Sequence, residues 1–373
     1  MADAITPIFI NGRFLGKSVT GIQRFAHEMV AALDAQLAAK DSALDSAKDS
    51  ALRPIILAPR GTPRPENLSR IGFAETGSLR GHAWEQWDLW RAARGGFLLN
   101  LCNSGPVLHP RQMVVIHDAA VYRMPENYSR AYGLFHRALG RVLARRARLA
   151  TVSDFSRREL MDVLGPRVAG MPVFPNGYDH ILRIVADAAI LDRLGLRHRP
   201  FFLFVGSPAP NKNLARAVEA FARLNRPDVS FVIVGAAQAA VFNAANMAKP
   251  ENVIMTGRLT DGEIVALYRH ATALVFPSLY EGFGIPPLEA MALGCPVVAS
   301  GIAPVRETCG DAARYFNPHD AGDIARAMRD ALSGPRENPA AQDAVRERLA
   351  LYSWPSSAGK LLDWLEKSTG GMR

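Results

Sequence analysis

Residues 277–300, PSLYEGFGIPPLEAMALGCPVVAS, constrain the fold of this chain more than any other segment. One apolar run, residues 273–276, precedes the segment, and a second, residues 296–299, lies near its end. Between them lie a glycine-containing turn and a helical stretch that starts at Pro286 and Pro287, because proline is tolerated in the first turn of a helix. Two apolar strands joined by a loop and a helix indicate a parallel sheet with helices on its faces.

The polar chemistry of this unit is concentrated in the turn, where Glu281 and Glu289 stand eight residues apart. The turn glycines allow close approach to the backbone, and we expect the amide N–H groups at the helix start to suit an anion such as a diphosphate. A carboxylate repels phosphate, so Glu289, expected in the first helical turn, should face a neutral ribose. Glu281 should face the hydroxyls of a sugar. This combination describes a nucleotide sugar, and the alternative is an acidic helix N-terminus in ordinary α/β packing.

The segment resembles the E-x7-E motif of retaining glycosyltransferases with the GT-B architecture, family 4, also called group 1. Further stretches resemble that family in order and spacing: TGIQRF, VVIHDAAVYRMPENYS, TVSDFSRREL, FPNGYD, FLFVGSPAPNKNL and GDAARYFNP. The resemblance extends over nearly the whole chain. Within the family, the chain is most similar to bacterial mannosyltransferases that build O-antigen and exopolysaccharide chains.

Apolar strands alternate with helices in both halves, which predicts an α/β fold of two doubly wound parallel-sheet, Rossmann-like domains. The resemblance implies the GT-B arrangement, in which the domains face an interdomain cleft. We expect an acceptor-side domain over residues 1–180, a linker over 181–200 and a nucleotide-sugar-binding domain over 201–350. Residues 351–373 should form a helix that crosses back to the first domain, anchored by Trp354 and Trp364. The repeat AKDSALDSAKDSAL is expected to be an exposed extension of the first helix.

Lys212 follows an apolar strand in the segment GSPAPNKN and is expected to neutralise the leaving diphosphate. The family pairs this lysine with an arginine, either one residue earlier or at the start of the loop. This chain has Asn211 and Ser207 at those places, and Arg258 is a candidate to compensate. The resemblance implies donor contacts from Gly206, Ser207, Lys212, Arg258, Glu281, Gly282, Phe283, Gly284, Ile285 and Glu289.

Other candidates lie in the first half of the chain. In the matching family position, His117 lines the cleft beside the transferred sugar, and Asp118 either orients the imidazole or caps the next turn. Gly21, Gln23 and Arg24 start a helix after the first strand, where the family's loop lies against the donor phosphates or the acceptor. Three tryptophans recur at steps of three, for sugar stacking or for packing: Trp84, Trp87 and Trp90. The catalytic set implied by the resemblance is His117, Lys212 and Glu281.

The resemblance implies transfer of a hexose with retained anomeric configuration, with GDP-mannose the preferred donor and a UDP-sugar the alternative. It implies a lipid-linked oligosaccharide acceptor, at the inner face of the cytoplasmic membrane. The departing phosphate oxygen would take the acceptor's proton. A nucleotide-sugar epimerase of the same architecture would need an acid/base set that the sequence does not supply. A non-catalytic glycan-binding scaffold would not need the two carboxylates, the lysine and the histidine.

Composition sets further bounds. No cofactor is expected beyond the donor, and no Asp-x-Asp pair or closely spaced histidine pair suggests a metal. Three scattered cysteines, an absent signal-peptide pattern and no apolar run of about 20 residues fit a cytoplasmic protein. The net charge is +9, without a nucleic-acid-binding signature. A basic helix face is expected to contact an anionic membrane peripherally through Arg137, Arg141, Arg145 and Arg148. The alternative is a solvated helix face.

Overall fold

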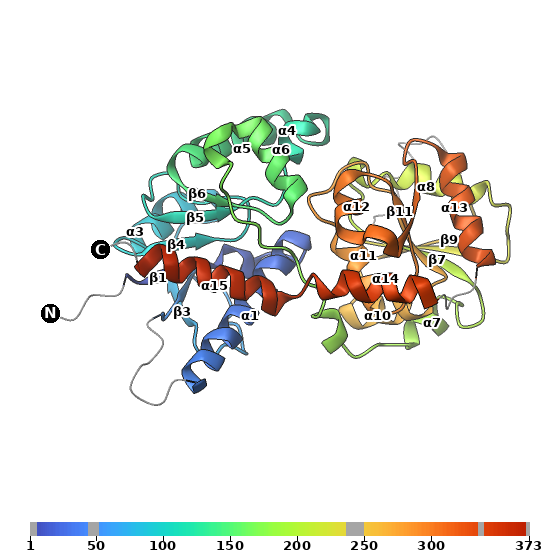
Figure 1. Ribbon diagram of the computed structural model, residues 1–373, viewed down its shortest axis with the longest axis horizontal. Coiled ribbons are helices and arrows are strands. Elements are labelled where there is room, and N and C mark those ends of the chain that lie inside the picture. The colour runs from blue at the N-terminus through green and yellow to red at the C-terminus, as the bar shows by residue number, and fades with distance from the viewer. Residues whose placement is uncertain (1–5, 44–51, 236–249, 335–338, 371–373) are drawn as a thin grey trace. The chain divides into compact units, whose positions relative to one another are not determined.

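The computed structural model describes residues 6–43, 52–235, 250–334 and 339–370, and it divides the chain into two compact units. The first unit comprises Met1–Asn176 and Ser353–Arg373, and the second comprises Gly177–Tyr352. Each unit contains a six-stranded parallel sheet, in the order β3-β2-β1-β4-β5-β6 or β12-β11-β10-β7-β8-β9 (Figure 1). The prediction of two doubly wound parallel sheets is confirmed.

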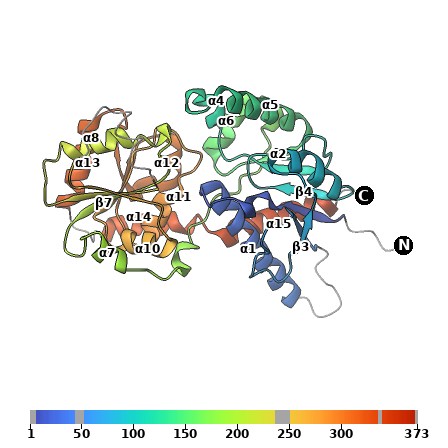
Figure 2. The same ribbon diagram turned by 180° about the vertical axis from the view of Figure 1, so that it is seen from behind.

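The strands of the first sheet are short, and its four inner strands are mainly apolar, as expected for strands that are covered on both faces. They are β1 (Ile8–Asn11), β2 (Ile55–Pro59), β3 (Gly72–Thr76), β4 (Phe97–Asn100), β5 (Gln112–Val115) and β6 (Arg148–Ala150). The long helices α1 (Gly21–Ala43) and α15 (Trp354–Gly370) pack against each other (Figure 2). Trp354 of α15 is buried against Phe25 of α1. The helices α5 (Arg130–Arg146) and α6 (Asp154–Leu164) contribute to a second apolar cluster.

Between β3 and β4 the chain makes an unusual helical segment. It runs through α2 (Gly81–Ala83), the π-helix η2 (Trp84–Leu89) and α3 (Trp90–Ala92). Trp84 is fully buried and donates from Nε1 to the Thr76 carbonyl at 2.8 Å, whereas Trp87 is 52% exposed. The three tryptophans therefore do not form one continuous surface, because the wide turn of the π-helix shifts the spacing of its side chains.

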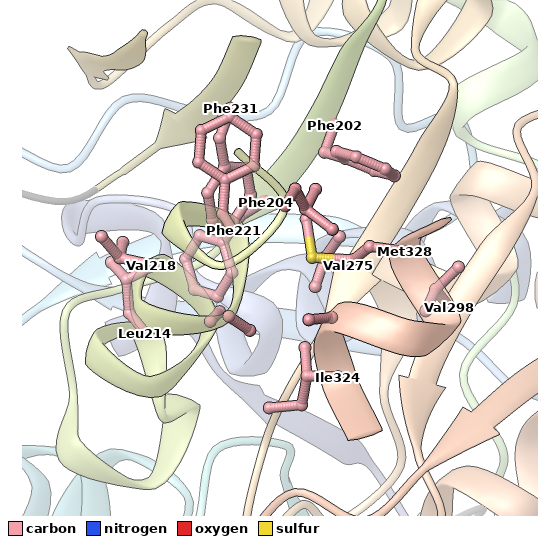
Figure 3. Packing of buried hydrophobic residues seen from close by; sticks show 14 of the residues in the cluster. Phe202, Phe204, Leu214, Val218, Phe221, Phe231, Val275, Val298, Ile324 and Met328 are labelled. Atoms are coloured by element: carbon pink, nitrogen blue, oxygen red, sulfur yellow. The ribbon is translucent and has the colours of Figure 1, made fainter. Parts of the chain in front are cut away.

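The second unit repeats the same architecture. Its strands are β7 (Phe201–Val205), β8 (Ser230–Val234), β9 (Val253–Gly257), β10 (Ala273–Phe276), β11 (Val297–Ser300) and β12 (Ala313–Phe316). Side chains of α8 (Leu214–Ala222) and α13 (Ala321–Ser333) pack with those of the sheet in one aromatic-rich core (Figure 3). The helices α10 (Asp261–His270), α11 (Ile285–Ala292), α12 (Ala303–Cys309) and α14 (Pro339–Ala350) complete the unit.

Residues 181–200, expected as a linker, instead belong to the second unit. They form the single turn η5 (Ile181–Arg183) and the short helix α7 (Ala189–Arg193), which packs against α10. The side chains of Ile190 and Leu191 are buried, so the segment contributes apolar packing that an extended connection would not provide. The repeat expected to extend the first helix lies largely outside the described residues.

The prediction that four arginines share one helix face is wrong for Arg148. Helix α5 ends at Arg146, and Arg148 is the first residue of β6, where its guanidinium lies 5.4 Å from the ring centroid of Trp364. Arg137 is half-buried on α5, and its Nη1 donates to the Val121 carbonyl at 3.4 Å. Of the four, only Arg141 and Arg145 are exposed on the helix.

Candidate functional site

The two most informative loops of the sequence meet in the second unit because of its strand order. The strands β7 and β10 are neighbours, although β8 and β9 lie between them in sequence. In a doubly wound sheet this reversal of order opens a crevice at the carboxyl ends of the two strands, where ligands bind. The loop after β7 carries the turn η6 (Pro210–Lys212), and the loop after β10 carries the turn residues 277–284.

Backbone and side-chain hydrogen bonds hold these two loops together. The amide N–H of Leu279 donates to the Asn211 carbonyl at 2.7 Å, and Asn211 Nδ2 donates to the Tyr280 carbonyl at 3.1 Å. Asn213 has a left-handed backbone, with φ of 55°, and its Nδ2 donates to the carbonyls of Pro277 and Pro318. Asn211, which stands where the family has an arginine, therefore cross-links the loops.

Lys212 and Glu281 form an ion pair at the centre of this junction. Lys212 Nζ lies 2.6 Å from Glu281 Oε1, and the two side chains are only 22% and 11% exposed. Lys212 Nζ also lies 5.8 Å from the ring centroid of Phe276, at the end of β10. The two side chains share one charge-assisted hydrogen bond. The sequence predicted that Lys212 would bind a diphosphate and that Glu281 would bind the hydroxyls of a sugar.

Three glycines lie together at the carboxyl ends of the adjacent strands β7, β8 and β9. Gly206 N donates to the Val234 carbonyl, and Gly235 N donates to the Gly257 carbonyl at 2.7 Å. Gly235 has φ of 93°, and a Cβ there would lie 2.6 Å from the Gly206 carbonyl oxygen. A side chain at Gly235 would therefore collide with the Gly206 carbonyl, so glycine is required there for the strand ends to approach each other.

Helix α11 starts at Ile285, as the two prolines predicted, with Gly284 at φ of 97° before it. Pro286 and Pro287 have no N–H group, so they remove two of the donors that a helix start normally offers. The remaining amides of the turn belong to residues 282–285. In this turn Phe283 and Ile285 are only 4% and 8% exposed, so their buried side chains hold the turn in place.

Glu289 lies in the second turn of α11, not the first, and two side chains donate hydrogen bonds to its carboxylate. His180 Nε2 donates to Oε1 at 3.0 Å, and the Tyr268 hydroxyl donates to Oε2 at 3.1 Å. Burial, followed by the charge of Glu289, raises the pKa of Tyr268 well above its ordinary value, so its hydroxyl remains a donor. His180 and Tyr268 were missed because nothing local in the sequence links them to residue 289.

His117 follows β5 in the first unit and is 6% exposed. Its Nε2 lies 2.9 Å from the Leu101 carbonyl, and a carbonyl only accepts, so Nε2 carries the proton and Nδ1 is the acceptor. Burial lowers the pKa of His117 to about 4, so the imidazole is neutral near pH 7. Asp118 Oδ1 accepts from the Ala120 amide at 2.8 Å, at the start of the short helix α4 (Ala120–Arg123).

The remaining candidates divide between the two units. Gly21, Gln23 and Arg24 form the first turn of α1, where Thr20 donates to the Gln23 side chain and Arg24 lies 3.9 Å from Glu28. Ser207 and Arg258 are exposed in the second unit.

The described residues contain no group of three or more His, Cys, Asp and Glu side chains that could hold a metal ion. In the same ranges, no helix combines the length and apolar character needed to cross a bilayer.

Comparisons with known proteins agree with this architecture. Residues 190–348 match the family model described as glycosyl transferases group 1. The serotype-specific mannosyltransferase WbdA of Escherichia coli is 40% identical over 111 residues, which are 30% of this chain and 14% of that protein. The O-antigen chain mannosyltransferase B of Escherichia coli is 26% identical over 256 residues, covering 65% of this chain and 67% of that protein.

The fold itself has solved counterparts. The crystal structure of Anabaena HepE in complex with UDP-glucose has a TM-score of 0.71 and 15% identity, covering 97% of this chain and 100% of that chain. The chain spans only 13–14% of the length of the WbdA proteins that it matches. The group 1 glycosyl transferase model matches most of the second unit, and the chain as a whole has the GT-B fold of the solved structures.

Proposed function

We propose that this protein is a retaining hexosyltransferase that moves mannose from GDP-mannose to a lipid-linked oligosaccharide during surface polysaccharide synthesis. The observation that carries the proposal is the Lys212–Glu281 pair, which lies where the carboxyl ends of β7 and β10 meet. The names of the relatives, O-antigen and serotype-specific mannosyltransferases, support mannose as the sugar. We place the protein in the cytoplasm, at the inner face of the cytoplasmic membrane.

In this proposal the donor takes over contacts that the protein makes with itself. Lys212 moves its charge from Glu281 to the diphosphate, whose negative charge grows as the glycosidic bond breaks. Glu281 accepts hydrogen bonds from hydroxyls of the transferred sugar, and Glu289 accepts them from the ribose. The amides of residues 282–285 donate to the phosphate and the sugar. Gly206, Ser207 and Arg258 are the further donor contacts.

For the first unit we propose that His117, as a neutral imidazole, accepts a hydrogen bond at Nδ1 from a hydroxyl of the transferred sugar. Gly21, Gln23 and Arg24 then belong to the phosphate or acceptor side. The leaving phosphate oxygen takes the proton of the attacking acceptor hydroxyl, and the new bond forms on the face from which the nucleotide departs. Lys212 supplies the positive charge that a divalent ion supplies in other enzymes, so no metal is required.

Donor turnover tests the function directly. The full-length protein, incubated with GDP-mannose and a lipid-linked acceptor extract, is expected to release GDP and to form an axial (α) mannosidic linkage, detected by NMR. Parallel reactions with UDP-glucose and other donors should be slower, and EDTA should leave the GDP-mannose rate unchanged. Release of no nucleoside diphosphate from any donor, together with binding of glycan, would instead support a non-catalytic scaffold. Loss of activity with EDTA, restored by Mg²⁺, would contradict the metal-independent mechanism.

We also propose that α5 places the protein on the membrane surface. Its outward residues combine apolar side chains, of which Leu134 is 65% and Phe135 43% exposed, with exposed arginines including Arg141 and Arg145. An exposed face of this composition binds an interface that offers both acyl chains and anionic headgroups.

A vesicle flotation assay tests this contact. The protein is expected to float with vesicles containing anionic lipid, and less so as salt is raised. The variant Arg141→Gln/Arg145→Gln should bind about 30-fold more weakly, since each basic residue near such a surface contributes about 1 kcal/mol. Arg148→Gln is the matched control, because Arg148 lies outside the helix. Equal loss in the control, or flotation with neutral vesicles alone, would contradict the proposal.

A further inference from the structure

The first unit has its own crevice position, which none of the proposed donor contacts uses. Its strand order reverses between β1 and β4, so the loops that follow these two strands meet. At this place Glu85, from the π-helix η2, is fully buried. Its Oε2 accepts from Asn11 Nδ2 at 3.1 Å and from Ser104 Oγ at 3.0 Å, and it lies 3.0 Å from Arg13 Nε.

This network is built to hold one cation in place. Burial alone would raise the pKa of Glu85, but hydrogen bonds and charges from His82, Arg13 and Asn11 outweigh it and lower the pKa. Arg13 is fixed at two points, because its Nη2 also donates to Ser104 Oγ at 2.6 Å. A π-helix is rare and occurs frequently at functional sites, and here it supplies the carboxylate that fixes Arg13.

Two basic side chains, Arg13 and Lys17, lie near the single carboxylate of Glu85. Lys17 is exposed and lies in the same loop as Arg13, and no ion pair joins its amine to a carboxylate of the described residues. Partial burial and then the charge of Arg13 lower the pKa of Lys17. Arg13 and Lys17 thus bring two basic side chains to the neighbourhood of one buried carboxylate, which favours an anionic ligand.

A row of aromatic rings continues from this charged end. His82 Nδ1 lies 3.5 Å from Glu85 Oε1, and its ring centroid lies 5.5 Å from that of His136 on α5. The next ring is Tyr132, whose centroid lies 4.1 Å from that of His136. Tyr128 stacks on Tyr132, with 5.4 Å between the ring centroids and an interplanar angle of 10°. Tyr132 is 49% exposed, so part of its ring is open to a ligand.

The electrostatics agree with this arrangement. Burial, followed by the electrostatic influence of the neighbouring His82 and Arg13, lowers the pKa of His136. At the far end, burial and then the charge of Asp118 raise the pKa of Tyr128 to about 12 and also raise that of Tyr132. The row therefore has a cationic end and an end with a carboxylate and phenol hydroxyls. A ligand that fits both ends carries an anionic group next to a polyhydroxylated ring.

We propose that this cluster, defined as Arg13, Lys17, His82, Tyr128, Tyr132 and His136, binds a phosphorylated sugar of the acceptor. Arg13 and Lys17 hold the phosphate, since a guanidinium donates well to phosphate oxygens. The rings of Tyr132 and His136 pack against the C–H face of the sugar. This inference rests on the proposed transferase function and adds to it a substrate class: the phosphate lies within a sugar or two of the accepting hydroxyl, as in a short lipid-diphosphate acceptor.

Calorimetry with soluble probes tests the site apart from catalysis. Mannose 1-phosphate is expected to bind the full-length protein at least about tenfold more tightly than methyl α-mannoside, which has the same ring without the phosphate. Arg13→Gln and Lys17→Gln should each weaken mannose 1-phosphate about 10- to 100-fold and leave methyl α-mannoside unchanged. Tyr132→Ala should weaken both probes by a similar factor. Melting temperatures of the variants show that they are folded.

Two controls identify the source of the phosphate and the specificity of the charge. GDP affinity should be unchanged in Lys17→Gln, and a parallel loss of GDP affinity would assign the cluster to the donor's diphosphate and overturn the proposal. Arg111→Gln removes the same charge next to the amino end of β5, at the opposite edge of the sheet, and should bind mannose 1-phosphate like the wild type. Equal affinity for the phosphorylated and methylated sugars would also overturn it. Tight mannose 1-phosphate binding without any donor turnover would keep the site and refute the transferase function.

Discussion

Lys212→Ala is expected to lower kcat about 10²–10³-fold with GDP-mannose, the loss typical of removing one group that stabilises developing negative charge. Lys212 is the cation at the junction of the β7 and β10 loops, and its side chain is 22% exposed, so water replaces its charge poorly. The KM for the donor should change less than kcat, because the diphosphate becomes more negative only as the bond breaks. Steady-state and single-turnover kinetics measure both effects.

The pairing with Glu281 makes a further control necessary. Lys212→Ala leaves the carboxylate of Glu281, 11% exposed, without its ion-pair partner, and this alone could disturb the loop. The double variant Lys212→Ala/Glu281→Gln removes that charge as well. It should recover the melting temperature but not kcat, and Lys360→Ala, an exposed lysine on α15, should retain full activity. A kcat for Lys212→Ala close to the wild-type value would remove Lys212 from the catalytic set.

Glu289→Ala is expected to weaken GDP binding about 10- to 100-fold, because a largely buried carboxylate that accepts from two ribose hydroxyls contributes about 1.5–3 kcal/mol. The same change leaves the Tyr268 hydroxyl and His180 Nε2 without their acceptor, so the melting temperature should also fall. Isothermal titration with GDP, at a temperature where every variant is folded, separates the two effects.

Two milder variants test whether the neighbours orient Glu289. Tyr268→Phe and His180→Gln each alter one partner and keep the carboxylate. Both should weaken GDP binding by less than Glu289→Ala and should raise the donor KM more than they lower kcat. Arg329→Gln, which changes an exposed arginine on α13 of the same unit, indicates how much a general charge change contributes. GDP affinity that is unchanged in Glu289→Ala would exclude the ribose contact.

Local sequence patterns were sufficient for the elements around the donor loops. The apolar run at residues 273–276 predicted β10 with its observed bounds, and the two prolines predicted the start of α11. These features depend on contacts within a few residues of chain, namely the period of apolar side chains and the missing proline N–H. The alternation of strands and helices predicted two doubly wound sheets for the same reason.

Local patterns failed where a residue's environment depends on distant chain. The spacing of four arginines continued a helix period past Arg146, but pairing with β5 made Arg148 part of a strand. Residues 181–200 have the composition of a connection, yet packing against α10 makes them part of the second unit. In both cases the tertiary contact, and not the local propensity, decided the structure.

By itself, then, the sequence determined the strands, the helices and the chemical types present in each loop, because those follow from local periodicity and backbone chemistry. Only the tertiary structure decided which loops meet. The strand order places β7 beside β10, so that Lys212 reaches Glu281 across 69 residues of chain. Tertiary packing likewise brings Tyr268 of α10, and His180 just before η5, within hydrogen-bond distance of Glu289. Strand order and helix packing minimise the exposed apolar surface of a whole unit, and no short segment of sequence contains that information.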